Sequence, residues 1–146
     1  MFCRLYELKV LTGIDLSAEN EVCIDSCPYC KDSGVCSISE EVNIPLSKEK
    51  FGWRISNKIA FEEPIPSKNG NTFYCNFIRL IHPIFSDIWI VRILKKDGET
   101  ISYLVYYTGK HTDTFKSLES ANKILKEKYK LNGRNIKEED FNVYNS

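Results

Sequence analysis

The chain has 146 residues, 42% of them hydrophobic, which is enough for one ordinary domain with its own core. Its 20 basic residues balance 20 acidic ones, so the overall charge gives no reason to expect a nucleic-acid or membrane binder. No apolar run approaches the roughly 20 residues of a membrane-spanning helix, and the charged N-terminus does not resemble a secretory signal. We therefore expect a cytoplasmic protein.

The first residues of the chain favour a short strand. Residues 2–11 place apolar side chains on one side of a two-residue repeat, and Gly13 follows as a terminator. These apolar positions are Phe2, Tyr6, Leu8 and Val10. A short helix is the alternative, and the alternation speaks against it.

Residues 15–45 are polar, rich in cysteine and weakly periodic, which predicts an irregular excursion rather than a helix or a strand. A loop of that length inside a compact domain normally needs something to order it. The clustered cysteines are the candidates for that role.

The middle of the chain predicts an antiparallel sheet. The expected strands cover residues 51–61, 72–81, 88–94 and 101–107, with a turn signal running from Pro64 to Asn71. Asp97-Gly98 is a hairpin signal. A two-residue turn there pairs Arg92 with Tyr103 and Leu94 with Ile101.

The strongest helical pattern spans residues 118–131. Ser117 is a suitable N-cap, lysines fill the last turns, and Gly133 lies just past the expected end. The apolar stripe consists of Leu118, Ala121, Ile124, Leu125 and Tyr129. The tail from Asn135 onward is polar, and we expect it to fray.

These patterns predict one α+β domain over residues 1–134: an antiparallel sheet, one main C-terminal helix and a Cys-rich excursion at 15–45 that zinc orders. Residues 135–146 form a polar C-terminal tail in this interpretation.

Four of the six cysteines lie in the segment CIDSCPYCKDSGVC, residues 23–36. Zn²⁺ accepts four thiolates, and C-x2-C is its common pair of ligands because the turn between them aims two sulfurs at one point. Cys27 and Cys30 supply this pair, and Cys23 and Cys36 are the nearest candidates to complete the site. Residues 27–34 resemble a zinc knuckle of the type found in J-protein chaperones, which implies a structural metal. Cys3, Cys75, His82 or His111 could replace one of the four ligands.

Three other interpretations of this segment stay open. Cys23, Cys27 and Cys30 are spaced like the radical-SAM cluster motif, but the chain lacks the length and strand–helix alternation of those barrels. CPYC resembles the glutaredoxin active site, which implies a thiol-redox enzyme, yet no buried strand precedes it and no helix start follows it. In an oxidising compartment the same cysteines would form disulfides or stay free.

Residues 88–131 resemble the three-strand-plus-helix DNA-binding domains of phage integrase arms and plant ethylene-response factors. That resemblance implies a nucleic-acid interface. The contact residues would be Trp89, Arg92, Lys95, Lys96, Lys110, Lys116, Lys123 and Lys126. An ordinary strand–strand–helix core whose lysines keep the helix in solvent is the simpler interpretation.

No catalytic constellation is present in the sequence, so we expect no enzyme. The leading hypothesis is a small binding or regulatory protein with a structural zinc site, of the kind that phages encode as accessory modulators or inhibitors. A protein partner is favoured over nucleic acid because the net charge is zero and no arginine-rich patch exists. A nucleic-acid-binding module and a thiol or metal enzyme centred on Cys27 and Cys30 are the alternatives.

Overall fold

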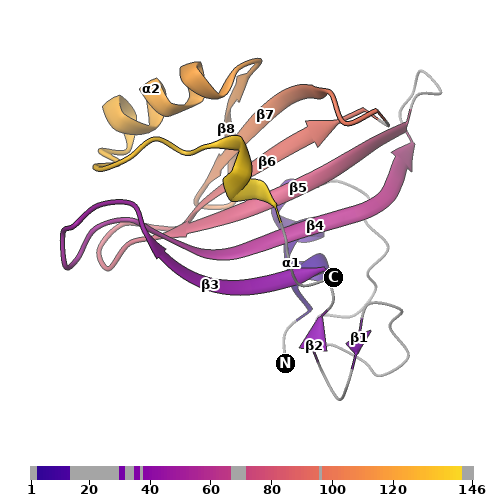
Figure 1. The fold of residues 1–146 in the computed structure, drawn as a ribbon, viewed down its shortest axis with the longest axis horizontal. Helices are drawn as coiled ribbons and strands as arrows, with labels where there is room; N and C mark the ends of the chain where they lie inside the picture. Colours follow the sequence, from indigo (N-terminus) through magenta and orange to yellow (C-terminus); the bar gives the residue numbers. More distant parts are fainter. Residues whose placement is uncertain are drawn as a thin grey trace.

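An antiparallel sheet of six strands runs through the molecule, each strand pairing with the next in the chain (Figure 1). The computed structural model describes residues 3–13, 30–31, 35–36, 38–66, 72–95 and 97–142, and every structural statement below concerns them. The six strands are β3 (Ser39–Pro45), β4 (Arg54–Pro66), β5 (Thr72–Ile81), β6 (Ile88–Leu94), β7 (Thr100–Tyr107) and β8 (Lys110–Phe115). With its helices, the sheet confirms the predicted α+β class.

Helices lie on opposite sides of this sheet (Figure 1). α2 (Leu118–Lys128) and the segment after it cover one face, where Trp53, Ile78 and Leu125 belong to one buried cluster. α1 (Arg4–Thr12) covers the other face, where Leu8 packs in a second cluster with Phe77 and Trp89. Both sides of the central strands are therefore buried, as the almost continuous apolar sequence of β6 indicates.

The strand predicted at residues 2–11 is wrong, because Arg4–Thr12 form the helix α1. Glu7 lies in the first turn, and Gly13 ends the helix at φ 74° with its N–H donating to the carbonyl of Lys9. Residues two positions apart in a helix face different sides of it, so Leu8 is fully buried while Val10 is 68% exposed. Gly13, a residue that commonly ends helices, was the sequence signal for this helix. The alternation of apolar residues along 2–11 pointed to a strand instead.

The excursion expected at 15–45 contains more regular structure than predicted. β1 (Cys30–Lys31) pairs with β2 (Val35–Cys36) in a small antiparallel ribbon, and β3 forms an edge of the main sheet. Side chains of β3 alternate between more and less exposed positions, as expected of an edge strand that is covered on one face. Residues 14–29, which include the expected zinc ligands Cys23 and Cys27, lie outside the described residues.

β4 runs beyond its predicted end and includes both Pro64 and Pro66. The register with β5 shifts between Phe61 and Ile65, so Pro64 falls at an irregularity where no ladder hydrogen bond has to be donated. The turn predicted to follow, at residues 67–71, lies outside the described residues. The strand predicted at 72–81 is confirmed with the same bounds.

The hairpin between β6 and β7 confirms the pairing of Arg92 with Tyr103. The expected pairing of Leu94 with Ile101 is wrong by one position, because a bulge makes Thr100 the partner of Leu94. Lys95 and Gly98 close the turn with a hydrogen bond of 2.9 Å, and Gly98 has φ 90°. The connection is thus longer than a two-residue turn, and the extra residue produces the bulge.

α2 begins as predicted, because the Ser117 hydroxyl accepts the amide of Ser120. The helix ends earlier than predicted, at Lys128. The amide of Leu131 donates to the carbonyl of Leu125, and Lys130 adopts φ 54°. In this ending a lysine holds the left-handed position after the helix that glycine usually takes.

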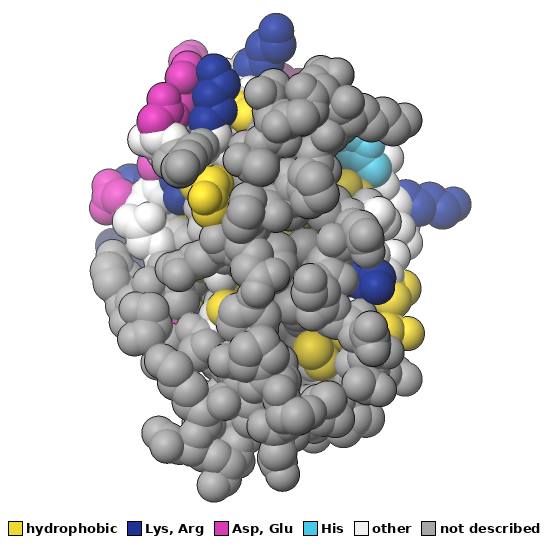
Figure 2. All heavy atoms as spheres, turned by 90° about the vertical axis from the view of Figure 1, so that its right-hand side faces the viewer, with side chains coloured by type: hydrophobic (Ala, Val, Ile, Leu, Met, Phe, Trp, Pro, Cys, Tyr) yellow, Lys and Arg dark blue, Asp and Glu magenta, His cyan; other side chains and the backbone are white. Residues whose placement is uncertain are grey.

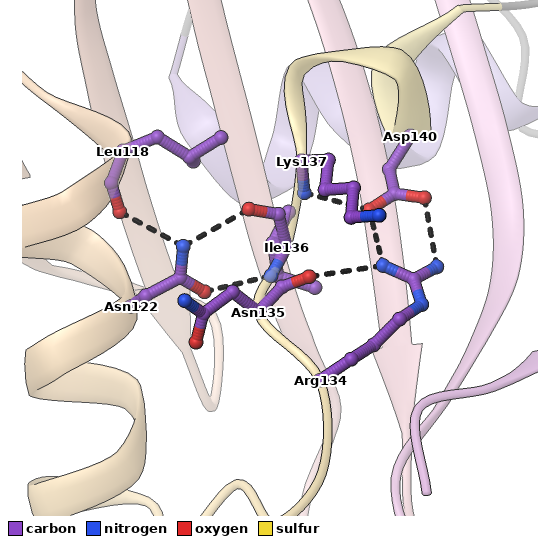
Figure 3. A network of polar contacts seen from close by, with 7 residues as sticks. All are labelled: Leu118, Asn122, Arg134, Asn135, Ile136, Lys137 and Asp140. Carbon is purple, nitrogen blue, oxygen red and sulfur yellow. Dashed lines mark hydrogen bonds and ion pairs between the residues drawn. The ribbon is translucent and has the colours of Figure 1, made fainter.

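The tail expected to fray from Asn135 is instead packed as far as Asn142. Ile136 and Phe141 are buried, and η1 (Glu138–Phe141) lies over the sheet. Figure 3 shows how the tail is held: the Asn122 side chain bonds both the amide and the carbonyl of Ile136. The segment is polar in overall composition, but its hydrophobic residues Ile136 and Phe141 are buried and hold it in place.

The second anchor in Figure 3 is an ion pair within the tail. Arg134 donates two hydrogen bonds of 2.9 Å to the carboxylate of Asp140, which also accepts the amide of Lys137. The Arg134 amide donates to the carbonyl of Leu46 at 2.7 Å. These bonds fix the segment after α2 against the loop that joins β3 to β4.

Candidate functional site

The predicted metal site lies largely outside the described residues. Cys23 and Cys27 are not described, whereas Cys30 and Cys36 are directly opposite one another in the β1–β2 ribbon. Opposed residues of an antiparallel pair have Cα atoms about 4.5–5.5 Å apart, a spacing that suits a shared zinc ion or a disulfide. Within the described ranges, no group of three or more His, Cys, Asp and Glu side chains could hold a metal.

The described alternative ligands do not form a metal-binding group. Cys75 is 1% exposed in the cluster on the α1 face, where burial raises the pKa of its thiol to about 12. Cys3 packs against the same cluster from α1. His111 is bonded to Thr114 on β8, and His82 lies in an aromatic group at the end of β5. Cys75 is therefore a buried hydrophobic residue.

The two strand residues predicted to contact a partner are both internal. Trp89 is 4% exposed on the α1 face, with the Arg79 guanidinium 5.4 Å from its ring centroid. Arg92 is 8% exposed on the opposite face, where it donates to Asn76 and Glu138 and lies over Phe141. These side chains contribute to the interior and present no contact surface.

The predicted lysine contacts do not form one patch. Lys95 pairs with Glu99 in the β6–β7 hairpin, and Lys96 lies outside the described residues. Lys110 begins β8 and Lys116 follows its other end, so the strand separates them. The remaining predicted contacts, Lys123 and Lys126, are exposed on α2. Among all of these, only Lys126 borders a hollow that we describe below.

A second hollow, which Lys126 does not line, lies at the end of the sheet that carries the β3–β4 and β5–β6 loops, on the left in Figure 1. It has a volume of about 310 Å³, and we call it the Trp53 hollow. Its lining residues are Trp53, Phe85, Tyr107, Thr112, Lys128, Tyr129 and Lys130. They come from the start of β4, the β5–β6 loop, the β7–β8 hairpin and the end of α2, so only the folded chain brings them together.

One wall of the Trp53 hollow is formed by two stacked rings, with His82 beside them. Phe85 stacks on Trp53 with ring centroids 6.0 Å apart and planes 9° from parallel. His82 contacts both rings, at 5.0 Å from Trp53 and 4.7 Å from Phe85. The Nδ1 atom of His82 accepts the amides of Ile84 and Phe85, so this histidine shapes the loop that carries Phe85.

The other wall is formed by two tyrosines. Tyr107 and Tyr129 have ring centroids 4.9 Å apart. The Tyr129 hydroxyl is bonded to the hydroxyl of Thr112 at 2.8 Å, and Thr112 also donates to the carbonyl of Val105. The Tyr129 hydroxyl of this wall therefore has a partner, and the lining of the hollow is mainly aromatic.

Lysines surround the opening. Lys130 lines both the Trp53 hollow and an adjoining, more polar hollow of about 450 Å³, whose other lining residues include Lys126 and Asn132. Lys128 is bonded to Asp113 at 3.2 Å, and this contact raises the pKa of its ammonium group. In the part of the chain that is described, no acidic side chain forms an ion pair with Lys126 or Lys130.

Three large exposed hydrophobic residues lie on the loops at this end of the sheet, namely Phe51, Ile84 and Phe85. The fourth among the described residues, Val10, lies on α1. Phe51, which is 65% exposed, lies in the β3–β4 loop, and Ile84, which is 83% exposed, lies in the β5–β6 loop. The stacking of Phe85 on Trp53 brings these two loops together. We call Phe51, Ile84 and Phe85 the loop surface. Large exposed apolar side chains on neighbouring loops are typical of interaction sites.

Sequence reasoning missed most of this site. Tyr129 was expected only as part of the helix stripe, and Trp53, Phe85, Lys128 and Lys130 were not selected. The available signal was Pro83-Ile84-Phe85, two large apolar residues directly after a proline in a segment that reads as a loop. Nothing in the sequence indicated that Trp53, far earlier in the chain, would stack on Phe85.

Figure 2 shows the opposite end of the molecule, where described hydrophobic side chains are scattered among charged ones of both signs. Of the helices that the structure describes, none is long and apolar enough to span a membrane. Comparisons with protein-family models, curated proteins and solved structures find no match to this chain. Functional inference therefore depends on the chain's own residues.

Proposed function

We propose that this chain is a non-enzymatic binding protein that docks on a protein partner through the loop surface and the Trp53 hollow. The observation that carries the proposal is the clustering of exposed Phe51, Ile84 and Phe85 beside an aromatic hollow. Large apolar side chains rarely stay in solvent at one place without a partner, and aromatic residues are enriched in interfaces. A regulatory or accessory role is consistent with a small domain that has no supported catalytic set.

Nucleic acid is the alternative partner, and the placement of the predicted contacts weakens it. Trp89 and Arg92 are buried, and the exposed lysines of residues 88–131 are spread over two ends of the sheet and one helix. A nucleic-acid interface needs a continuous basic surface that follows the phosphates. The loop surface offers an aliphatic residue, Ile84, at its most exposed point, which suits a protein better than a nucleobase.

The test is partner capture with matched variants. The protein is immobilised, and proteins retained from an extract of the source organism are identified for the wild type and for Phe51→Ser/Ile84→Ser. Val10→Ser is the control, because Val10 is equally exposed but lies on α1. We expect a retained protein that the loop variant loses and the control keeps. Equal retention by all three proteins would exclude this surface.

We also propose that the Cys-rich segment holds a structural zinc ion, with Cys23, Cys27, Cys30 and Cys36 as ligands. The opposed positions of Cys30 and Cys36 support a shared site. Protein purified from zinc-supplemented cells should contain about one equivalent of zinc, released when the thiols are modified. A disulfide detected by mass spectrometry, or bound iron, would instead favour one of the alternative interpretations of these cysteines.

A further inference from the structure

The chemistry of the Trp53 hollow and its surround specifies what kind of segment docks there. We propose that the hollow receives one large apolar side chain from an acidic segment of the partner, and that Lys126 and Lys130 bind the acidic residues beside it. This inference rests on the proposed docking function and adds the chemical class of the ligand.

The size and lining of the hollow define the apolar part of the ligand. A volume of about 310 Å³ is at the lower end of the roughly 300–1,000 Å³ of ligand pockets, so it fits one side chain and not a folded element. Its walls are the rings of Trp53, Phe85, Tyr107 and Tyr129. The Thr112 hydroxyl already bonds Tyr129 and the carbonyl of Val105. An apolar group therefore does not displace the partner of the Tyr129 hydroxyl, and the buried Nε1 of Trp53 has no partner among the described residues to lose.

The charges around the opening define the polar part. Lys128 is occupied by Asp113, and the nearby carboxylate of Glu49 is bonded to Asn132. Glu127 is exposed on α2, between two of the lysines. Lys126 and Lys130 border the polar hollow next to the Trp53 hollow, and no described acidic side chain pairs with them. Two adjacent cations that lack an internal counter-charge complement carboxylates on a partner.

The backbone at Lys130 supports a role for its side chain. Lys130 has φ 54° at a helix end where glycine would be accommodated without strain. A non-glycine residue in this conformation carries a conformational cost, which favours a role for its side chain outside the fold. The position also offers a variant that removes the charge without endangering the structure.

An acidic peptide segment accounts for these observations better than single-stranded nucleic acid. Bases bind by stacking on open aromatic faces. Here Trp53 is already stacked on Phe85, and Tyr107 is already in contact with Tyr129. The exposed aliphatic Ile84 offers no stacking face, and the chain as a whole has zero net charge.

The experiment selects ligands from a library of random peptides displayed on phage, panned against the full chain. We expect enriched peptides to combine a large apolar residue with neighbouring Asp or Glu. The strongest peptide without tryptophan is then synthesised and titrated while the fluorescence of Trp53 is followed in a Trp89→Phe background. Added salt should weaken the binding.

Three variants in the same background locate the site. Lys130→Gly should weaken the peptide by about fivefold while the unfolding midpoint stays the same or rises. Phe85→Ala should weaken it by about tenfold or more. Lys116→Gln is the control, because this exposed lysine follows the far end of β8, and it should leave the affinity unchanged.

Several results would overturn the inference. They are the absence of any enriched peptide, enrichment without acidic residues, an unchanged affinity in Lys130→Gly, or tighter binding of a dT oligonucleotide at the same site. Partner capture separates this failure from failure of the proposed function. If Phe51→Ser/Ile84→Ser still loses the partner, the docking surface is correct and only the ligand class is wrong.

Discussion

Two residues just after α2 have positive φ angles for different reasons. Lys130 has φ 54° and an exposed side chain that lines both hollows. Gly133 has φ 120° and lies against the loop that joins β3 to β4. A Cβ atom on Gly133 would overlap the carbonyl of Leu46 and come within 2.8 Å of the Ser47 Cβ. At Gly133 glycine is required by this contact as well as by its φ, whereas Lys130 shows that the first position accepts a side chain.

We therefore expect Gly133→Ala to lower the free energy of unfolding by at least about 2 kcal/mol, because backbone atoms have to move. Gly98→Ala is the control: Gly98 has φ 90° but open space around it, so only the conformational cost of about 1 kcal/mol applies. Urea denaturation of both variants measures the difference. A loss in Gly133→Ala no larger than in Gly98→Ala would show that the close approach is not important.

Asp140 supplies a prediction on pH dependence. Burial raises the pKa of this carboxyl, but the hydrogen bonds from Arg134 and from the amide of Lys137 lower it further, and the net result is a pKa below its usual range. A carboxyl with a lowered pKa stabilises the fold above the ordinary value of about 3.9 and loses that effect as the pH falls through the folded-state pKa.

We expect Asp140→Asn to cost about 1–3 kcal/mol at pH 7, since two charge-assisted hydrogen bonds are weakened. The difference from the wild type should shrink as the pH falls below about 4. Chemical denaturation at a series of pH values measures it, with the exposed Glu139→Gln as the control. A difference that stays constant down to pH 3 would contradict this account.

At the scale of elements, α1 is the part of the fold on which sequence pattern and structure disagree. Phe77, Trp89 and Tyr106 form an apolar surface on one face of the sheet, and α1 covers it with Leu8. That burial, together with the Gly13 cap, outweighs the weak alternation of residues 2–11. The prolines in β4 are a second case in which the tertiary structure overrides a local pattern. Proline normally interrupts a strand, but the irregular pairing of β4 with β5 accommodates Pro64.

The pair Leu8 and Val10 distinguishes the helix from the predicted strand. In a strand both side chains share one face, whereas in α1 Leu8 is fully buried and Val10 is 68% exposed. Leu8→Ala should therefore lower the free energy of unfolding by about 2–5 kcal/mol, and Val10→Ala by less than about 0.5 kcal/mol. Thermal and urea unfolding give both values. Similar losses in the two variants would favour the strand.

At the scale of the whole molecule, one sheet separates two buried clusters. The chain's two tryptophans mark them: Trp53 belongs to the cluster under α2, and Trp89 to the cluster under α1. Adjacent residues of each central strand point into different clusters, so neither cluster can lose its packing while the sheet stays intact. We infer that the two sides unfold together.

The single-tryptophan variants Trp53→Phe and Trp89→Phe test this coupling. Within each variant, the fluorescence midpoint in urea should coincide with the midpoint of far-ultraviolet circular dichroism. Each variant serves as its own reference, so a change in overall stability does not affect the comparison. A fluorescence transition clearly before the loss of secondary structure would mean that one side opens separately.

Local sequence patterns determined much of this architecture. The runs at 72–81 and 88–94 are strands as expected, Arg92 pairs with Tyr103, and Ser117 caps α2. These features follow from neighbouring residues alone, namely a β-branched or aromatic run, a turn that closes between adjacent strands, and a hydroxyl beside free helix amides.

Only the tertiary structure decided the features that depend on distant contacts. It made residues 4–12 a helix and buried Ile136 and Phe141 in a polar tail. It also stacked Trp53 on Phe85 beside the lysines that follow α2. The physical reason is that burial and stacking depend on which segments meet across the sheet. That depends on the free energy of the whole chain and not on the spacing of residues along it.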